Sequence, residues 1–285
     1  MDDVNVGIVG LGNVGSGTVT ILAENAEQIA LKLGFNLRVK AVSSLDADTR
    51  QLPESLGPVE RTLDWRRVAT HPEVDIVVEL VGGTTVAREI LETAIDNKKS
   101  VVTANKELMA LCGPDLWDRA IGAGVNVAME ASVAGGIPIH AVLREGISGD
   151  RLVALYGILN GTSNYILTEM EKHGDSLEKV LAEAQRLGFA EANPGADIDG
   201  WDARSKLALL AAHPQSALMH AEVIVMRRKM RRKKHNIHTI ASRSCSFINL
   251  VYHAERCCCL RYTLSDVIIV YSGAARWVRA AISVV

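Results

Sequence analysis

The sequence has no run of about 18 uncharged apolar residues, which is the length that a membrane-spanning helix requires. It begins Met1-Asp2-Asp3, and this acidic start lacks the basic region and apolar core of a secretory signal peptide. Aromatic residues make up only 4% of the 285 residues, but 48% are hydrophobic, so the chain can bury a sizeable core. These observations predict a globular cytoplasmic protein with no membrane partner.

Cysteine and glycine are unevenly distributed. Cys112 is the only cysteine before residue 213, and the other four, at positions 245, 257, 258 and 259, show neither CxxC spacing nor a disulfide framework. Only Gly273 of the 23 glycines lies after residue 212. Residues 213–285 hold 12 Lys and Arg against 3 Asp and Glu, which leaves 19 basic and 30 acidic residues before them from the totals of 31 and 33. We interpret residues 213–285 as an atypical basic tail.

Apolar runs and helical stretches alternate along residues 1–130. The first run is followed by Gly10-Leu11-Gly12-Asn13-Val14-Gly15 and a helical stretch to about Leu33. Further helical stretches lie at about 86–97 and 106–122. The strand-like runs are 4–9, 36–43, 74–80, 100–103 and 125–129. This alternation predicts an α/β domain, a Rossmann-type doubly wound parallel sheet covered by helices.

The alternation of apolar runs and helical stretches ends after Glu130, where a glycine-rich connection over 134–138 leads to a helix that ends near Gly146. The change predicts a second, α+β domain over 131–212; the family resemblance described below implies that this domain is incomplete. Its expected elements are a strand at 151–160, amphipathic helices at 163–172 and 176–187, a loop at 188–201, and a helix from Asp202.

The glycine turn predicts a dinucleotide site, because backbone amides at a helix N-terminus must closely approach a pyrophosphate. Gly10 permits the tight turn, Gly12 permits close approach, and Gly15 lets the helix pack on the strand, while Asn13 and Val14 begin the helix. The second strand ends in two serines rather than the carboxylate typical of an NAD site. With Lys40 and Arg50 nearby, this favours NADP over NAD, although these residues are equally well explained as surface charges.

Residues 184–206 read Ala-Gln-Arg-Leu-Gly-Phe-Ala-Glu-Ala-Asn-Pro-Gly-Ala-Asp-Ile-Asp-Gly-Trp-Asp-Ala-Arg-Ser-Lys, a segment that resembles the homoserine dehydrogenase motif at every constrained position. The segments 103–106, 130–138 and 157–164 are similar to the same family. The resemblance covers residues 4–212 and implies NAD(P)-dependent interconversion of aspartate semialdehyde and homoserine. It also implies a substrate-binding and dimerisation domain, and so a homodimer when the chain is complete.

The resemblance assigns roles to single residues. Lys206 matches the catalytic lysine, Glu191 and Asp202 match homoserine-binding carboxylates, and Asp197 joins them through the motif. The cofactor-proximal positions are Lys106 and Gly188. The resemblance also implies a monovalent cation, usually sodium, held largely by backbone carbonyls at Glu130, Val133, Gly135 and Ile137.

The chemistry of this reaction agrees with those residue types. The substrate carries an ammonium group, which requires carboxylates, and a lysine can stabilise and protonate the oxygen that receives negative charge during hydride transfer. Asp202 and Lys206 are four residues apart and share a helix face. Taken by itself, that spacing also describes an ordinary exposed ion pair.

Three alternatives stay open at this level. The first is another amino-acid dehydrogenase on the same architecture, and the second is a catalytically impaired nucleotide-binding protein with a basic tail. The third is binding of nucleic acid or an acidic membrane by residues 226–234, of which seven are basic. That third reading is disfavoured because no aromatic residues interleave the run. The resemblance stops near Ala212, where His213-Pro214 is expected to end the helix, so the chain is predicted to be poorly active.

Overall fold

The computed structural model describes residues 2–149, 152–212, 220–221, 267–272 and 280–282. Contacts divide the chain into two units, Met1–Ser132 and Val133–Val285. The basic run at 226–234 and the expected helix breaker at 213–215 both lie outside the described residues. None of the helices in the described part is both long and apolar enough to cross a membrane.

The first unit is built on a parallel sheet with the strand order β3-β2-β1-β4-β5-β6. Its strands are β1 (Asp3–Val9), β2 (Asn36–Ser43), β3 (Glu60–Thr62), β4 (Ile76–Glu79), β5 (Ser100–Thr103) and β6 (Val127–Ala128). The strand order reverses between β1 and β4, which defines the switch point of a doubly wound sheet. The predicted fold class of this unit is therefore confirmed.

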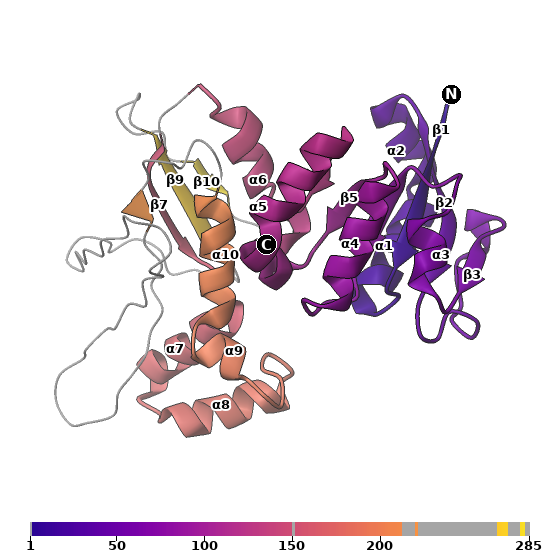
Figure 1. Ribbon diagram of the computed structural model, residues 1–285. Helices are drawn as coiled ribbons and strands as arrows, with labels where there is room; N and C mark the ends of the chain where they lie inside the picture. Colours follow the sequence, from indigo (N-terminus) through magenta and orange to yellow (C-terminus); the bar gives the residue numbers. More distant parts are fainter. Residues whose placement is uncertain (1, 150–151, 213–219, 222–266, 273–279, 283–285) are drawn as a thin grey trace. The chain divides into compact units, whose positions relative to one another are not determined.

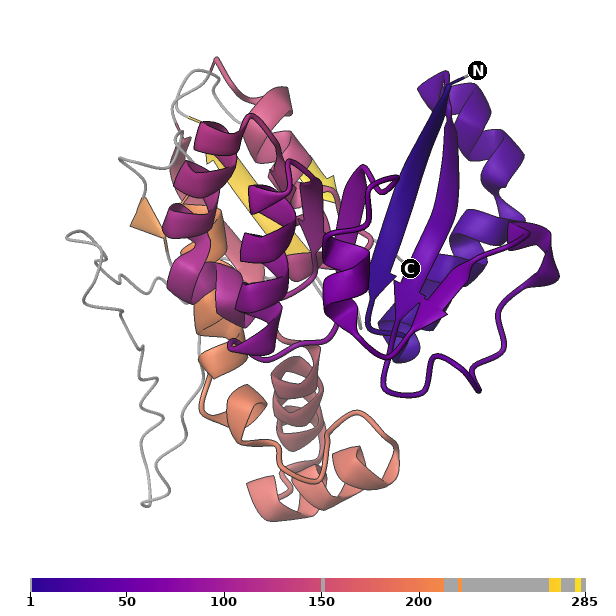
Figure 2. The same ribbon diagram turned by 45° about the vertical axis from the view of Figure 1, so that its right-hand side comes forward.

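Helices cover both faces of this sheet. Its helices are α1 (Asn13–Glu24), α2 (Ala26–Leu33), α3 (Trp65–Ala69), α4 (Val86–Asp96) and α5 (Lys106–Ala123), with short 3₁₀ turns η1 (Glu54–Leu56) and η2 (Glu130–Ser132). Figures 1 and 2 show α1 and α2 on one face and α3, α4 and α5 on the other. This arrangement is the one that right-handed crossovers produce.

The core of the first unit lies under β1, which explains the nearly continuous apolar run in the sequence. The side chains packed there are Val6, Ile8, Leu11, Val19, Val39, Val42 and Val78. The sequence predicted one helical stretch to Leu33, but the chain breaks it at Asn25, where the backbone leaves the helical region. The predicted strand at 125–129 is also shorter, at two residues.

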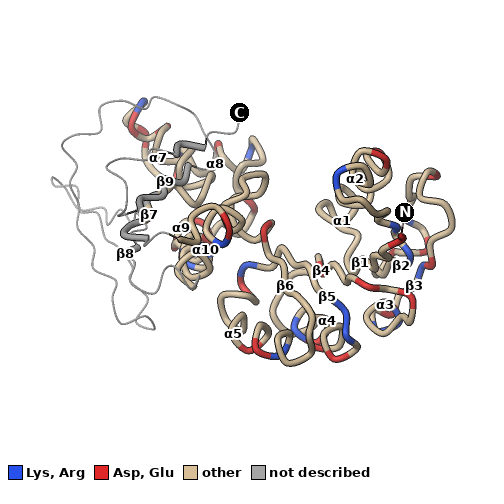
Figure 3. Tube along the Cα trace, turned by 90° about the horizontal axis from the view of Figure 1, so that it is seen from above, with Lys and Arg blue, Asp and Glu red and all other residues tan. Residues whose placement is uncertain are grey.

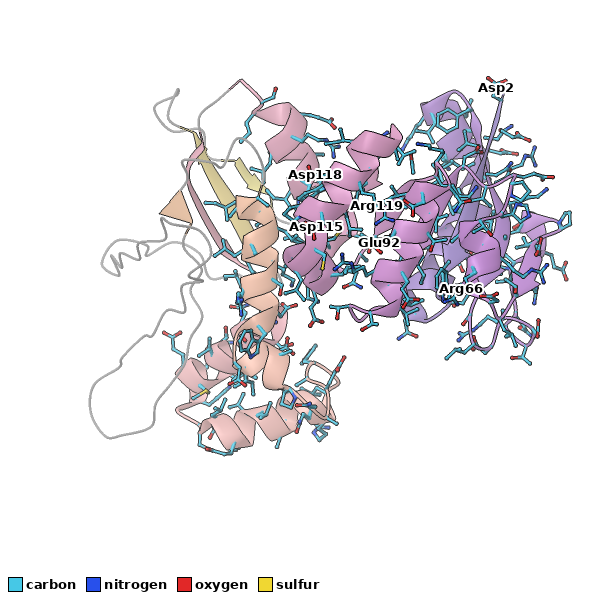
Figure 4. The ribbon with its side chains drawn as sticks, viewed as in Figure 1. Asp2, Arg66, Glu92, Asp115, Asp118 and Arg119 are labelled. Carbon is cyan, nitrogen blue, oxygen red and sulfur yellow. The ribbon has the colours of Figure 1, made fainter. Side chains whose placement is uncertain are left out.

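Charged residues join α4 and α5 on the outer surface, where acidic and basic positions alternate in Figure 3. Arg119 of α5 makes two hydrogen bonds to Asp96 of α4, at 2.7 and 2.6 Å. Figure 4 shows Arg119 and Glu92 directed toward one another, and their closest nitrogen and oxygen are 3.7 Å apart. These contacts link the two helices that cover the second half of the sheet.

The second unit contains a mixed sheet with the order β10-β9-β7-β8. Its strands are β7 (Leu152–Ile158), β8 (His220–Ala221), β9 (Val267–Ser272) and β10 (Ala280–Ile282). The last three come from the region that the sequence analysis set apart as a tail, and β9 pairs with β7 in antiparallel register.

Among the described residues of the second unit, helices make up most of the part outside the sheet. They are α6 (Ile139–Ala141), the π-helical turn η3 (Val142–Gly146), α7 (Gly161–His173), α8 (Leu177–Arg186), α9 (Gly195–Ile198) and α10 (Trp201–Ala211). Helices α7 and α8 pack through a small core that includes Ile166, Met170 and Val180. The predicted loop at 188–201 is wrong in one respect, because α9 forms within it.

Candidate active site and cofactor site

The glycine turn after β1 is packed against the chain that follows β4. Gly10 has a φ of +99°, and a Cβ there would lie 2.6 Å from the backbone of Leu80. The amide of Gly10 donates to the carbonyl oxygen of Ser43 at 2.8 Å, which ties the turn to the end of β2. Only glycine satisfies both this left-handed backbone and this close approach.

The other two glycines have different surroundings. A Cβ on Gly15 would lie 1.9 Å from the carbonyl oxygen of Gly10, so Gly15 is required for the helix to meet the strand. A Cβ on Gly12 would meet nothing within 4 Å, so the space before α1 is open. Helix α1 has no acidic residue in its first turn and no side chain capping its N-terminus. Its amides and this open space fit a pyrophosphate.

Of the residues that the sequence analysis connected with cofactor preference, Ser44 and Arg50 meet at Asp46 beyond the end of β2. The Ser44 hydroxyl donates to Asp46 at 2.6 Å, and Arg50 forms an ion pair with the same carboxylate at 2.6 Å. The hydrogen bond from Ser44, followed by the guanidinium of Arg50, lowers the pKa of Asp46 below its ordinary value. Lys40 is engaged elsewhere, in an ion pair with Glu73. Arg50 is therefore the cation closest to this carboxylate.

Lys106 is the first residue of α5, directly after β5 and its connecting turn. Asn105 caps this helix by accepting a hydrogen bond from the amide of Leu108 at 3.1 Å. Lys106 is half-buried. The helix start thus brings a cation to the carboxyl-end edge of the sheet, the edge at which α/β proteins bind ligands.

Within the second unit, Lys206 and Asp202 form the ion pair that their spacing predicts. Their nitrogen and oxygen are 3.0 Å apart, and the two side chains are 16% and 10% exposed. The Lys206 ammonium also donates to the carbonyl oxygen of Leu159 at 2.6 Å. The pair is therefore largely shielded from water and differs from an ordinary surface pair.

Asn160 links the candidate carboxylates. Its side-chain amide donates to Asp197 at 2.7 Å and to Asp202 at 2.9 Å, and its own oxygen accepts from the amide of Ser163 at 2.7 Å. Each polar atom of Asn160 has a partner, so its orientation is fixed. Sequence reasoning gave Asn160 no role, although an asparagine directly before a helix is a common cap.

The structure does not bring Glu191 into this cluster of Asn160, Asp197, Asp202 and Lys206. Glu191 is exposed, and its hydrogen bond in the described part of the chain is made by its backbone oxygen, which accepts from Gln185 at 3.0 Å. Gly188 has a φ of +79° just after α8, so its helix-ending conformation already explains a glycine there.

The proposed cation residues fall in both units, with Glu130 in η2 and the others in the connection before α6. Val133 and Ile137 are buried, whereas Gly135 is exposed. Ala134 and Gly136 have φ values of +49° and +88°, so the backbone here is irregular. Among the described residues, no group of three or more His, Cys, Asp or Glu side chains could hold a metal.

Two family models match the chain. The model described as "Homoserine dehydrogenase, NAD binding domain" matches residues 10–130, and the model described as "Homoserine dehydrogenase" matches residues 138–265. The second match extends past Ala212, where the sequence analysis ended the resemblance.

Relatives give the same result over most of the chain. The homoserine dehydrogenase of Pseudomonas aeruginosa is 48% identical over 213 residues, which are 74% of this chain and 48% of that protein. The homoserine dehydrogenase of Bacillus subtilis is 43% identical over 214 residues, again 74% of this chain and 48% of that protein. The chain thus spans about half the length of the curated relatives it matches.

Solved structures are also similar. The homoserine dehydrogenase of Thiobacillus denitrificans has a TM-score of 0.70 and 47% identity, covering 77% of this chain and 49% of that one. A hyperthermophilic archaeal homoserine dehydrogenase in complex with NADPH has a TM-score of 0.62 and 27% identity, covering 73% and 68%. On the two family models and these relatives, the chain belongs to the homoserine dehydrogenase family.

Proposed function

We propose that this chain catalyses the NAD(P)-dependent interconversion of L-aspartate 4-semialdehyde and L-homoserine. The observation that supports the proposal most directly is the ion pair between Lys206 and Asp202, which is shielded from water. Asn160 holds Asp202 and the Leu159 carbonyl oxygen holds Lys206. When bound, a nicotinamide cofactor exchanges a hydride with the carbon that bears the substrate oxygen.

Lys206 acts on the substrate oxygen. Its described contacts, to Leu159 and Asp202, use two of the three ammonium hydrogens, so a third can be donated to the substrate. Negative charge grows on the oxygen as the aldehyde is reduced, and the ammonium stabilises this charge and supplies the proton. In the reverse direction the same nitrogen receives the proton of the hydroxyl group.

The carboxylates divide the remaining work. Asp202 is occupied by Lys206 and Asn160, so its main effect is to hold the lysine. Glu191 is exposed, and the described contacts leave its carboxylate available to receive the substrate ammonium. Asp197 is tied to Asn160 and adds negative charge to the cluster that contains Lys206.

The competing reading, another amino-acid dehydrogenase on this architecture, is tested by substrate choice. We expect turnover, followed by the absorbance of NADPH, to favour aspartate semialdehyde over glutamate semialdehyde by at least about tenfold, because one methylene discriminates to this extent. Equal kcat/KM for the two aldehydes would contradict the proposal.

We further propose NADP as the preferred cofactor. Arg50 lies beside Ser44 and can exchange its contact with Asp46 for a 2′-phosphate, which accepts bidentate hydrogen bonds from arginine. Arg50→Ala should therefore weaken NADPH binding by about tenfold and leave NADH binding unchanged. An equal effect on both cofactors would show that Arg50 does not select between them.

Four finer assignments belong to the proposal and rest on family membership. The first is a monovalent cation, proposed to be sodium, bound at Glu130, Val133, Gly135 and Ile137. The others are a homodimer, a cytoplasmic location, and a place in threonine, methionine and isoleucine biosynthesis. The irregular backbone around Ala134 fits the first, because hard cations are often bound by carbonyl oxygens outside regular helices and strands.

A further inference from the structure

Glu79 is a buried carboxylate with no part in the chemistry described above. It is the last residue of β4, and its exposed fraction is 0%. One oxygen accepts hydrogen bonds from the amides of Val81 and Gly82, at 2.8 and 3.1 Å, and the other accepts from the Thr103 hydroxyl at 2.6 Å. A buried charge is costly unless it is hydrogen-bonded, and here three donors meet it.

These contacts shape the loop of residues 80–85, which joins β4 to α4. Two amides of the loop turn back onto the Glu79 carboxylate, and the backbone then passes through Gly82 and Gly83 at φ values of +74° and +68°. At its start, the backbone of Leu80 faces Gly10, where a Cβ would lie 2.6 Å away. The loop is therefore fixed against the glycine turn of the cofactor site.

The same carboxylate connects the loop to the start of α5. The Thr103 hydroxyl accepts from the Asn105 amide at 3.0 Å while it donates to Glu79. The Asn105 side chain donates to the carbonyl oxygen of Gly83 at 2.6 Å and caps α5 through Leu108. The contacts form a closed ring that runs from Glu79 through Thr103 and Asn105 to the loop and back.

This ring lies at the switch point of the sheet, at the carboxyl end of β4. In a doubly wound sheet the first three strands bind one mononucleotide half and the last three bind the other, with the glycine turn between them. We propose that Glu79 is a positioning residue that holds the 80–85 loop and the start of α5 in the shape that receives the nicotinamide half. This inference rests on the cofactor assignment of the proposed function.

The test compares two ligands on the full chain. NADPH contains both halves, whereas adenosine 2′,5′-bisphosphate represents the adenosine half alone. Glu79→Gln keeps the size of the side chain but replaces the carboxylate by a neutral amide whose NH₂ cannot accept a hydrogen bond, and Thr103→Val removes the hydroxyl at constant shape. We expect each variant to raise the NADPH Kd about tenfold or more, the scale of a lost hydrogen bond to a charged group, with an unchanged Kd for the bisphosphate.

The controls use matched side chains. Thr103→Ser keeps the hydroxyl and should restore NADPH affinity. Thr62 is a matched control, because it ends β3, is buried, and its hydroxyl accepts a hydrogen bond from the backbone amide two residues later at 3.1 Å, as the Thr103 hydroxyl does at 3.0 Å. Thr62→Val should leave the NADPH Kd unchanged. Circular dichroism and thermal melting establish that each variant is folded.

Several results would overturn the inference. Normal NADPH affinity in the folded Glu79→Gln and Thr103→Val variants would overturn it. An equal loss of affinity for NADPH and for the bisphosphate would show that Glu79 has only a general structural role. An unmodified chain that binds no NADPH would remove the cofactor assignment together with this inference. A chain that binds NADPH but does not turn over aspartate semialdehyde would refute the proposed function alone, since the Kd comparison does not depend on turnover.

Discussion

Substitutions at Gly12 and Gly15 should separate a glycine kept for a ligand from one kept for packing. A Cβ at Gly12 meets no atom within 4 Å, and its φ of −63° is open to any residue. Replacing a helix N-cap glycine by valine costs about 1 kcal/mol or less, so Gly12→Val should lower Tm by only a few degrees. The added side chain occupies the space before α1, so NADPH binding should be abolished.

Gly15→Ala should behave in the opposite way. Its Cβ would lie 1.9 Å from the Gly10 carbonyl oxygen, whereas real Cβ contacts essentially never fall below 3.0 Å, so the backbone must move by about 1 Å. Because the obstacle is backbone rather than a flexible side chain, the cost should reach about 3 kcal/mol, near the upper end for overpacking. That cost corresponds to a fall in Tm of roughly 10 °C.

The assay is NADPH fluorescence titration beside thermal melting of the same samples. Unchanged NADPH affinity in Gly12→Val would mean that the turn is not the cofactor site. A fall in Tm as large as that of Gly15→Ala would show that Gly12 has a packing role that the open space does not predict.

Three other predictions concern single contacts. Glu191→Ala should raise the homoserine KM with a smaller effect on kcat, and a fall in kcat alone would contradict a role in substrate binding. Asn160→Ala should lower kcat by about 10²-fold, the scale for a catalytic group misplaced by about 1 Å, and unchanged steady-state kinetics would refute its positioning role. The hydrogen bond from Arg119 lowers the pKa of Asp96, so its stabilisation is complete above the ordinary value of 3.8 and is lost as pH falls through the lowered value. The Tm difference between the protein and Arg119→Gln should shrink in acid, and a difference that is constant with pH would contradict this sign.

Local patterns predicted most of the first unit. The apolar runs located β1, β2 and β5 because buried parallel strands need apolar residues on both faces. Strand β3 was missed, since Glu60-Arg61-Thr62 is a polar edge strand with no periodic signal. Helix α3 was missed because five residues are too few for helical periodicity.

The candidate site divides in the same way. The contact between Asp202 and Lys206 could be predicted, since helical geometry brings side chains four residues apart together. The contacts of Asn160 cross 37 and 42 residues, and the Glu79–Thr103 contact crosses 24, so no local pattern reports them. Glu191 shows a different limit of sequence reasoning: the motif identified the residue but did not reveal where its carboxylate lies.

The most direct test of the catalytic account is homoserine-dependent reduction of NADP by the full chain and by Lys206→Ala. The account predicts that the variant folds, binds NADPH with unchanged affinity, and loses about 10²–10⁴-fold in kcat, the usual scale for a positioned acid or base. Near-normal kcat in the folded Lys206→Ala variant would contradict it.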